Sequence, residues 1–429
     1  MITELLLSFI SIIAIAFVAH YRPTEFFLFC IFILSGFLGV IPYEVLKPLT
    51  PENILFFVSI SIFVEVIISI LFTAKIKKMN KLNIFPFLMA MLFIYGVAKP
   101  IVDGNSGLQL AITDGKQVVS YTILLFVLIK YKQINKLIVE KSVVFIGLLL
   151  SIYVVAAASF KIYPPGYLPV NPNGTISFSE NIHIKYPMFI LFAYFLLMDN
   201  TVIRNPYLRS TMRFLLFMGV ILQSHMSITL LFLIIFCVAW LYKRVEITRT
   251  LKVSIAASAI LIFSGYALIS NKNVFENIVS ESSSIASRFL INQYRFDYIY
   301  QEPILGYGFI HEDSSLGAIF NGSSIGLHDK RLATIDAGYI DILVRFGLLG
   351  LISIVFLYLL YVSRLNKLAV DLKGKVFIYF LYGMIPVSLT WSILTYNHGI
   401  ISIACATLFI LGGANEKESG NNNQYAYTV

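Results

Sequence analysis

Two arginines in a long polar segment, residues 271–336, have the type and spacing expected of a phosphate-binding pair. Arg288 and Arg295 lie seven residues apart, which is two turns of a helix, so both are expected on one face. Guanidinium groups bind phosphate oxygens in a two-pronged geometry. We interpret the pair as a clamp for a diphosphate. Spacing leaves a second interpretation open, in which a helix at the membrane surface extends both side chains toward lipid headgroups.

Three residues of the same segment could take a proton from an acceptor hydroxyl. Asp336, just before an apolar run, is the best candidate for a general base. An Asp before a helix also accepts hydrogen bonds from backbone N–H groups, so a helix cap is its alternative role. His311 and His328 are the two histidines of the segment, and each is either a proton acceptor or a solvated loop residue.

A tight turn is predicted within this segment. Pro303 stops a helix, and Gly306 and Gly308, one residue apart, allow backbone conformations that other residues rarely adopt. Such a turn can approach another backbone or a ligand closely. A polar excursion of this length in an otherwise apolar chain is expected to be a catalytic or binding loop.

Further ionisable residues lie in or between apolar runs, where a functional role is the default hypothesis. Arg345 is expected to face a cavity or to pair with Glu65. His225 lies at a turn between two runs, close to where a lipid diphosphate would bind. Arg213, near the start of a helix, is expected to extend toward the inner membrane surface.

The frame that must position these residues is apolar. Of the 429 residues, 58% are hydrophobic and 13% are charged, against about 25% charged in a soluble domain. This composition predicts an all-α polytopic membrane protein with twelve or thirteen transmembrane helices. The apolar runs lie near residues 2–19, 25–46, 53–74, 84–98, 117–130, 142–160, 186–203, 209–224, 226–242, 251–270, 337–363, 376–393 and 398–413.

Basic residues predict the orientation of the helices. The net charge of +9 is explained by the positive-inside rule, and no nucleic acid partner is indicated. Nineteen of the 32 Lys and Arg residues lie in five alternate connections, 75–81, 130–141, 204–213, 243–252 and 364–375. The connections between them, 99–116, 161–185 and 394–398, hold four, so these and 271–336 are predicted to be external.

The chain is thereby divided into four parts. Residues 1–270 form an N-terminal transmembrane bundle, and 271–336 form a large external catalytic loop before the third-last helix. Residues 337–413 form the C-terminal helices, and 414–429 are predicted to be a disordered cytoplasmic tail. The sequence contains no Walker loop, zinc-ligand pair or nucleophile elbow. Because ATP is absent outside the membrane, catalysis there needs a substrate that is already activated, such as a lipid-linked sugar diphosphate.

The order and spacing of these motifs resemble the signature region of the O-antigen polymerase and O-antigen ligase superfamily. In that pattern an Arg precedes a Pro and two glycines by about fifteen residues, as Arg288 precedes Pro303 here. A polar residue, a Tyr three residues later and two glycines in the next helix follow, matching Asp336, Tyr339, Gly347 and Gly350.

The resemblance implies a bacterial plasma-membrane glycosyltransferase with a GT-C-like fold and an external active site. Its donor would be an undecaprenyl-diphosphate-linked oligosaccharide, and it would need no metal or other cofactor. The residues that we assign to catalysis are Asp336, His311 and His328. Those that we assign to substrate binding are Arg288, Arg295, Arg345, His225, Tyr339, Gly306 and Gly308.

Two departures from the family pattern bear on the reaction. Ligases usually carry His where this chain has Asp336, which favours a polymerase of repeat units for O-antigen, capsule or exopolysaccharide. Many members have Ser-Arg where this chain has Ser224 and His225, so the usual phosphate-binding Arg is either absent or replaced by His225.

Three other functions remain alternatives. One is a ligase that moves finished glycan to another acceptor, and another is a flippase or transporter for lipid-linked glycan. The third is a non-catalytic membrane scaffold, in which the glycine turn and the arginine pair would be incidental. Charges concentrate on the external side rather than along a central path, which counts against transport. Besides the donor and membrane lipid, a chain-length regulator and a flippase are candidate partners.

Overall fold

The described part of the chain is entirely helical. The computed structural model describes residues 2–34, 51–73, 81–160, 187–198, 200–223, 226–244, 284–311, 313–317, 319, 338–389 and 391–426, and no strand occurs in these ranges. The predicted all-α class is therefore confirmed for them. The GT-C-like arrangement stays a prediction.

Three described helices are long and apolar enough to cross a membrane: α5 (Ile84–Val102), α8 (Lys136–Phe160) and α15 (Gly338–Leu368). The number rises to five if each of two bent helix pairs is counted as one span. The first joins α1 (Ile2–Tyr21) to α2 (Pro23–Leu34) at 120°, and the second joins α6 (Leu108–Gly115) to α7 (Tyr121–Lys130) at 51°. The chain is a multi-pass membrane protein; a total of twelve or thirteen helices stays a prediction.

The other described helices complete the fold. They are α4 (Pro51–Thr73), η2 (Lys81–Asn83), η3 (Val118–Ser120), α9 (Met188–Leu196), α10 (Pro206–Leu222), α11 (Met226–Arg244), α13 (Ser284–Gln301), α16 (Leu372–Val387) and α17 (Asn397–Ala426). Most begin and end close to the predicted apolar runs. The run 251–270 lies outside the described residues.

Two elements differ from the sequence-based expectation. Helix α6 lies in the connection 99–116, which was expected to be a loop; its eight residues are too few and too mixed to stand out as an apolar run. Helix α17 extends to Ala426, through most of the tail that was expected to be disordered. Ala414, Glu416 and Lys417 favour helix, so they can prolong the turns that precede them.

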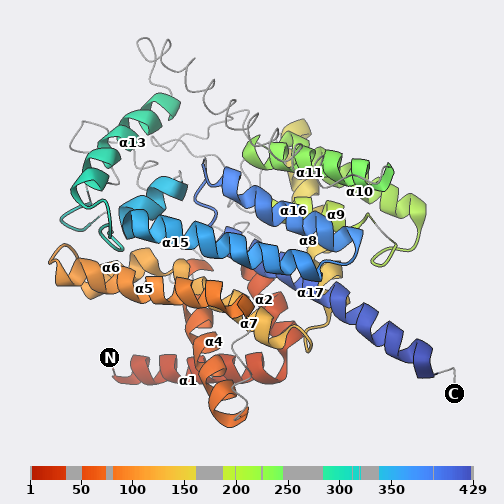
Figure 1. The fold of residues 1–429 in the computed structure, drawn as a ribbon, viewed down its shortest axis with the longest axis horizontal. Helices are drawn as coiled ribbons and strands as arrows, with labels where there is room; N and C mark the ends of the chain where they lie inside the picture. Colours follow the sequence, from red (N-terminus) through yellow and green to blue (C-terminus); the bar gives the residue numbers. More distant parts are fainter. Residues whose placement is uncertain are drawn as a thin grey trace.

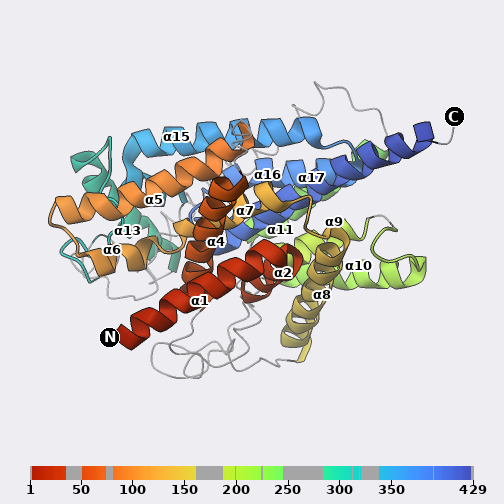
Figure 2. The ribbon, with the colours of Figure 1, turned by 90° about the horizontal axis from the view of Figure 1, so that it is seen from below.

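Helix α15 carries two of the predicted site residues, Tyr339 and Arg345. It packs against α5 on one side and α16 on another, and α13 crosses near its start (Figure 1). The perpendicular view shows the same neighbours, with α6 and α13 at the end of the bundle where α15 begins (Figure 2). The elements that carry the predicted site residues therefore meet at one end of α15.

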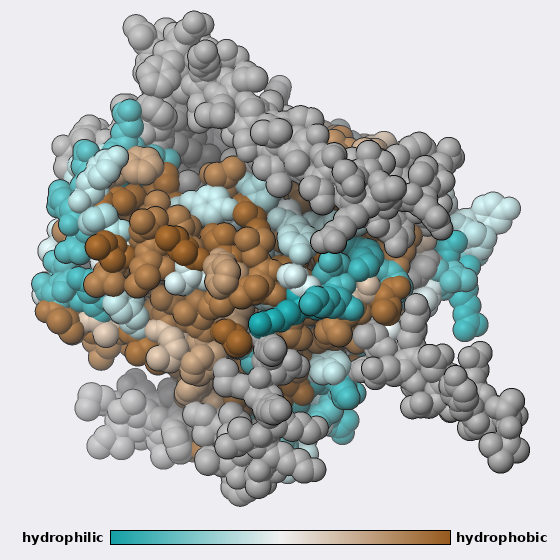
Figure 3. Space-filling view, viewed as in Figure 1, coloured by the Kyte–Doolittle hydropathy of each residue, from teal (hydrophilic) through white to brown (hydrophobic). Residues whose placement is uncertain are grey.

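An exposed apolar face runs along α5 and α15 (Figure 3). On α15 the side chains of Leu349, Ile352 and Phe356 are between 58% and 59% exposed, and on α5 Phe87 and Ile94 are 50% and 58% exposed. Hydrophilic residues gather at the edges of this face (Figure 3). Such a face fits contact with lipid chains, in which apolar surface is not penalised.

Buried charges in the predicted inner connections are paired. Lys130 Nζ lies 2.9 Å from Glu65 Oε1, and Lys373 Nζ lies 3.0 Å from Glu140 Oε1. His20 Nδ1 also lies 3.1 Å from Glu65 Oε1. The suggestion that Glu65 pairs with Arg345 was therefore wrong, because Glu65 lies between residues of α1 and α7.

Two connections that the charge pattern places outside are in direct contact. The Ser315 hydroxyl donates a hydrogen bond of 2.9 Å to the Asn105 carbonyl oxygen. This contact joins connection 99–116 to the segment 271–336, as expected if both lie on the same side of the membrane.

The predicted orientation can be tested by cysteine labelling. A cysteine at Ser315, which is exposed, is expected to react with an impermeant thiol reagent in intact cells, whereas one at Lys78 is expected to react only after lysis. The charge asymmetry of the connections is the reason for this expectation. Labelling of the Lys78 site in intact cells would reverse the topology and remove the external active site.

Candidate functional site

Residues 303–309, which we call the strap, dock into a break in α15. The break lies at Gly347, whose φ of 61° and ψ of −167° are not helical. The strap and α15 exchange four backbone hydrogen bonds across it: Tyr307 N to Val344 O (2.8 Å), Gly308 N to Arg345 O (2.8 Å), Leu348 N to Pro303 O (2.8 Å) and Leu349 N to Ile304 O (3.2 Å). Backbone groups released by the break are thereby paired, as buried backbone groups must be.

Glycine is required on both sides of this junction. Gly306 has a φ of 66°, and a Cβ there would lie 2.7 Å from the Gly347 nitrogen. A Cβ on Gly347 would lie 2.3 Å from the Ile304 oxygen, and one on Gly308 would lie 2.6 Å from the Gly96 oxygen. The close approach predicted for this turn is therefore an approach to the backbones of α15 and α5. Substrate binding by Gly306 and Gly308 stays a prediction.

Gly347→Ala is expected to lower the free energy of unfolding by at least about 2 kcal/mol. The added methyl group would clash with the backbone of Ile304, and alanine would be strained at the positive φ of this position. The melting temperature in detergent and the amount in membranes measure this. Gly107→Ala is the matched control, because a Cβ there has no heavy atom within 4 Å among the described residues. Equal stability of both variants would show that the junction is not tightly packed.

Phe309 anchors the end of the strap between three helices. Its side chain is fully buried, and its ring lies 5.6 Å from that of Phe346 on α15. Gly96 of α5 and Gly115 of α6 leave room for the ring: a Cβ on either would lie within 2.8 Å of it. The backbone N–H of Phe309 donates to the Gly96 carbonyl oxygen at 2.7 Å. Phe309 thus fixes the distances between α5, α6 and α15.

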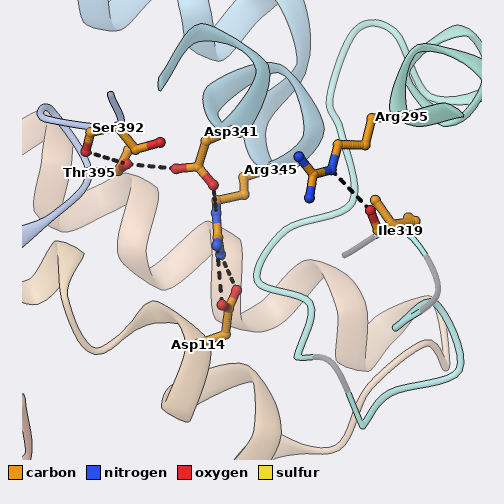
Figure 4. A network of polar contacts seen from close by, with 7 residues as sticks. All are labelled: Asp114, Arg295, Ile319, Asp341, Arg345, Ser392 and Thr395. Carbon is orange, nitrogen blue, oxygen red and sulfur yellow. Dashed lines mark hydrogen bonds and ion pairs between the residues drawn. The ribbon is translucent and has the colours of Figure 1, made fainter. Parts of the chain in front are cut away.

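Arg345 forms the centre of a buried ionic network (Figure 4). Its Nε donates to Asp341 Oδ1 at 2.6 Å, and its Nη1 and Nη2 contact the two carboxylate oxygens of Asp114. The hydroxyl of Thr395 donates to Asp341 Oδ2 at 2.6 Å. Asp341 is fully buried and the Arg345 side chain is 8% exposed. The network joins α6, α15 and the connection before α17. The N–H donors of Arg345 therefore stabilise the packing of these elements.

Arg295 faces inward from α13. It is 2% exposed, and its Nε donates to the Ile319 carbonyl oxygen at 3.1 Å while its Nη1 donates to Asn292 Oδ1 at 3.0 Å (Figure 4). The alternative in which Arg295 extends to lipid headgroups was therefore wrong. Its guanidinium holds the chain that follows the strap against α13.

Tyrosines bind α13 to the strap. The Tyr307 hydroxyl donates to the Tyr298 carbonyl oxygen at 3.0 Å, and the hydroxyls of Tyr294 and Tyr298 lie 2.7 Å apart. Burial, and secondarily the hydrogen bond with Tyr294, raises the pKa of Tyr298 to about 12. Burial also raises the pKa of Tyr307. These phenols stay neutral at physiological pH and serve as hydrogen-bonding groups.

His311 lies just beyond the strap. Its Nδ1 accepts a hydrogen bond of 3.2 Å from the Asp313 backbone N–H and lies 3.4 Å from the Asp313 carboxylate. The imidazole is 22% exposed, so one face can reach solvent. Tyr339, in the first turn of α15, donates its hydroxyl to the Ile385 carbonyl oxygen at 2.7 Å and ties α15 to α16.

The structure does not describe the side chains of the remaining predicted site residues. Asp336, His328 and His225 lie outside the described residues, and Arg288 is described only as part of helix α13. Helix α15 begins at Gly338, two residues after Asp336. The structure brings α13, which carries Arg295, to the start of α15, which carries Tyr339 and Arg345 (Figures 1 and 2). The strap, which precedes His311, is hydrogen-bonded to the same part of α15.

Residues 211–355 match the model of a family described as O-antigen ligase. This match supports the resemblance of the chain to the O-antigen ligase and polymerase superfamily. A comparison with curated proteins finds no match. Members of this superfamily are glycosyltransferase-like enzymes that act on lipid-linked oligosaccharides in membranes.

The superfamily match extends from within α10 to within α15, so it contains α13, the strap and the break at Gly347. It does not contain Asp114 or Thr395, which complete the ionic network from outside it. Sequence reasoning missed both residues as well as Asp341. The spacing of Asp341 and Arg345, four residues apart on one helix, was an available signal, because such residues face each other.

Proposed function

We propose that this protein polymerises undecaprenyl-diphosphate-linked oligosaccharide repeat units into a surface polysaccharide on the external face of the membrane. The observation that carries the proposal is the junction between the strap and α15. It holds the two halves of the family's signature region together in the first turns of α15, the helix that begins two residues after Asp336 in the sequence. The match of residues 211–355 to the O-antigen ligase family favours an enzyme over a transporter.

The proposed reaction is a displacement at the anomeric carbon of the growing glycan. Asp336 takes the proton from a hydroxyl of the incoming repeat unit, and that oxygen forms the new glycosidic bond. The bond between the anomeric carbon and the diphosphate breaks, and undecaprenyl diphosphate leaves. Arginine donors stabilise the charge that develops on the leaving group. In this arrangement the segment 271–336 is the catalytic loop of a GT-C-like enzyme.

Among the arginines, Arg288 is the proposed diphosphate ligand, and Arg295 and Arg345 hold the frame. Arg295 and Arg345 are buried against protein acceptors, which supports this division. His311 and His328 remain candidates for a second proton-transfer step, and His225 for a contact to the lipid diphosphate.

Replacement of Arg288 by Lys is expected to lower polymerisation roughly ten- to a hundredfold, because an ammonium cannot make the two-pronged contact and about 1.5–3 kcal/mol is lost. Polymer length on a gel beside a membrane-protein blot measures this. Arg204→Lys, at an exposed position in a predicted inner connection, is the control and should keep full activity. Full activity of Arg288→Lys at a normal protein level would contradict the clamp.

A deletion strain separates the proposed polymerase from a ligase. Without a polymerase, single lipid-linked repeat units accumulate, whereas without a ligase, long lipid-linked chains accumulate. Mass spectrometry of the lipid-linked intermediates is expected to find single repeats. The presence of Asp336 where ligases usually have His supports this expectation. Accumulated long chains would instead identify a ligase.

A further inference from the structure

A cavity of about 360 Å³ between α9 and α10 lies outside the proposed site. It is lined by Arg209, Ser210 and Arg213 of α10, by Tyr194 of α9, and by the rings of Phe214 and Phe217. None of the described residues that line it carries a carboxylate. The cavity thus combines two positive charges with aromatic surface, and its described lining residues supply no anion.

Arg213, which was expected to extend toward the inner membrane surface, is held in place by Tyr194. The Arg213 Nη2 donates to the Tyr194 hydroxyl at 2.9 Å, and the centre of its guanidinium lies 4.7 Å from the centre of the Tyr194 ring. Tyr194 is 6% exposed, so this contact holds the guanidinium at the wall of the cavity.

Each of the two guanidinium groups has one buried N–H donor that is not hydrogen-bonded to the described residues. Arg209 Nη1 and Arg213 Nε are buried, and in the part of the chain that the structure describes neither has a hydrogen-bond partner. A buried donor without a partner is unfavourable unless a ligand satisfies it. The N–H groups at the start of α10 are not available, because the Asn205 side chain accepts from Tyr207 N and Leu208 N. Any anion must therefore be bound by the side chains.

We infer that this cavity binds the phosphate group of a lipid on the inner side of the membrane. Connection 204–213 is one of those that the charge pattern places inside, where anionic lipids meet basic pockets. The exposed apolar residues of α10, Tyr207 (84%), Leu208 (47%) and Phe214 (63%), provide a surface for the lipid chains. The same chemistry fits a bilayer phospholipid and an isoprenoid phosphate.

The test uses the purified full-length protein in neutral detergent, with bound lipid counted by native mass spectrometry. Wild-type protein is expected to retain phosphatidylglycerol in preference to phosphatidylcholine. The double variant Arg209→Gln/Arg213→Gln should retain at least about tenfold less phosphatidylglycerol, because two charge-assisted contacts are lost. Arg204→Gln, exposed and outside the cavity, should match wild type. Equal retention by the double variant would overturn the inference.

A single variant and two competing ligands complete the experiment. If the double variant does not accumulate, Arg209→Gln alone takes its place. This single variant leaves the contact between Arg213 and Tyr194 intact, so it should fold and should still retain less phosphatidylglycerol than wild type. Undecaprenyl phosphate that displaces phosphatidylglycerol at equal concentration would identify the isoprenoid lipid as the ligand, and failure to displace it would identify the phospholipid. Inorganic phosphate that raises the melting temperature as much as either lipid would overturn lipid binding.

Discussion

Asp336→Asn is expected to abolish polymer formation while the protein still inserts and accumulates normally. A general base needs an ionisable group, and positioned proton transfer contributes about 10²–10⁴-fold to rate, so activity should fall at least a hundredfold. Asn preserves the size and the accepting oxygen of the side chain, which separates this role from a structural one. Polymerised glycan on a gel beside a membrane-protein blot measures both quantities.

The helix-cap explanation of Asp336 makes a different forecast. A cap needs only a short side chain with an accepting oxygen, so Asn and Ser would be tolerated, and Ala would lower stability by about 1 kcal/mol. Asp336→Ser therefore serves as the second variant, expected to be stable and inactive. Full-length glycan from Asp336→Asn would reject the general base and leave Asp336 as a cap for α15.

Arg345→Leu is expected to have the largest effect on folding. It leaves Asp114 and the fully buried Asp341 without their cation, and breaking a buried pair in this way costs about 3–5 kcal/mol. The protein should melt at lower temperature in detergent and accumulate poorly in membranes. Because the network joins α6 to α15, loss of activity should follow loss of folded protein.

A double variant distinguishes this structural role from substrate binding. Arg345→Gln combined with Asp114→Asn removes one charge of each sign, so it should be more stable than Arg345→Gln alone. If Arg345 bound substrate instead, Arg345→Leu would accumulate and melt like wild type yet lose polymerisation. That result would return Arg345 to the diphosphate site.

Local patterns in the sequence predicted the helices and one essential contact. Apolar runs predicted α5, α8 and α15 closely because a membrane helix needs a continuous stretch of such residues. The two glycines of the strap predicted a close approach, since only glycine allows it. The partner of that approach, the broken α15 at Gly347, was not predicted, although the family signature contains both halves.

Contacts between distant residues could not be predicted. Asp114 and Arg345 are 231 positions apart, and no local pattern shows that α6 would carry Asp114 to α15. The inward orientation of Arg295 depends in the same way on the chain at Ile319 folding back over α13. Spacing on a helix gives the relative direction of two side chains, but it does not show which neighbouring element each one faces.

The most direct test of the proposed function is polymerisation by the purified protein. The full-length chain in proteoliposomes would receive an undecaprenyl-diphosphate-linked repeat unit as both donor and acceptor. We expect a ladder of lipid-linked products that differ by one repeat unit, with one undecaprenyl diphosphate released per linkage and no ladder from Asp336→Asn. Transfer of preformed glycan to a separate acceptor, with no ladder from single repeats, would contradict a polymerase.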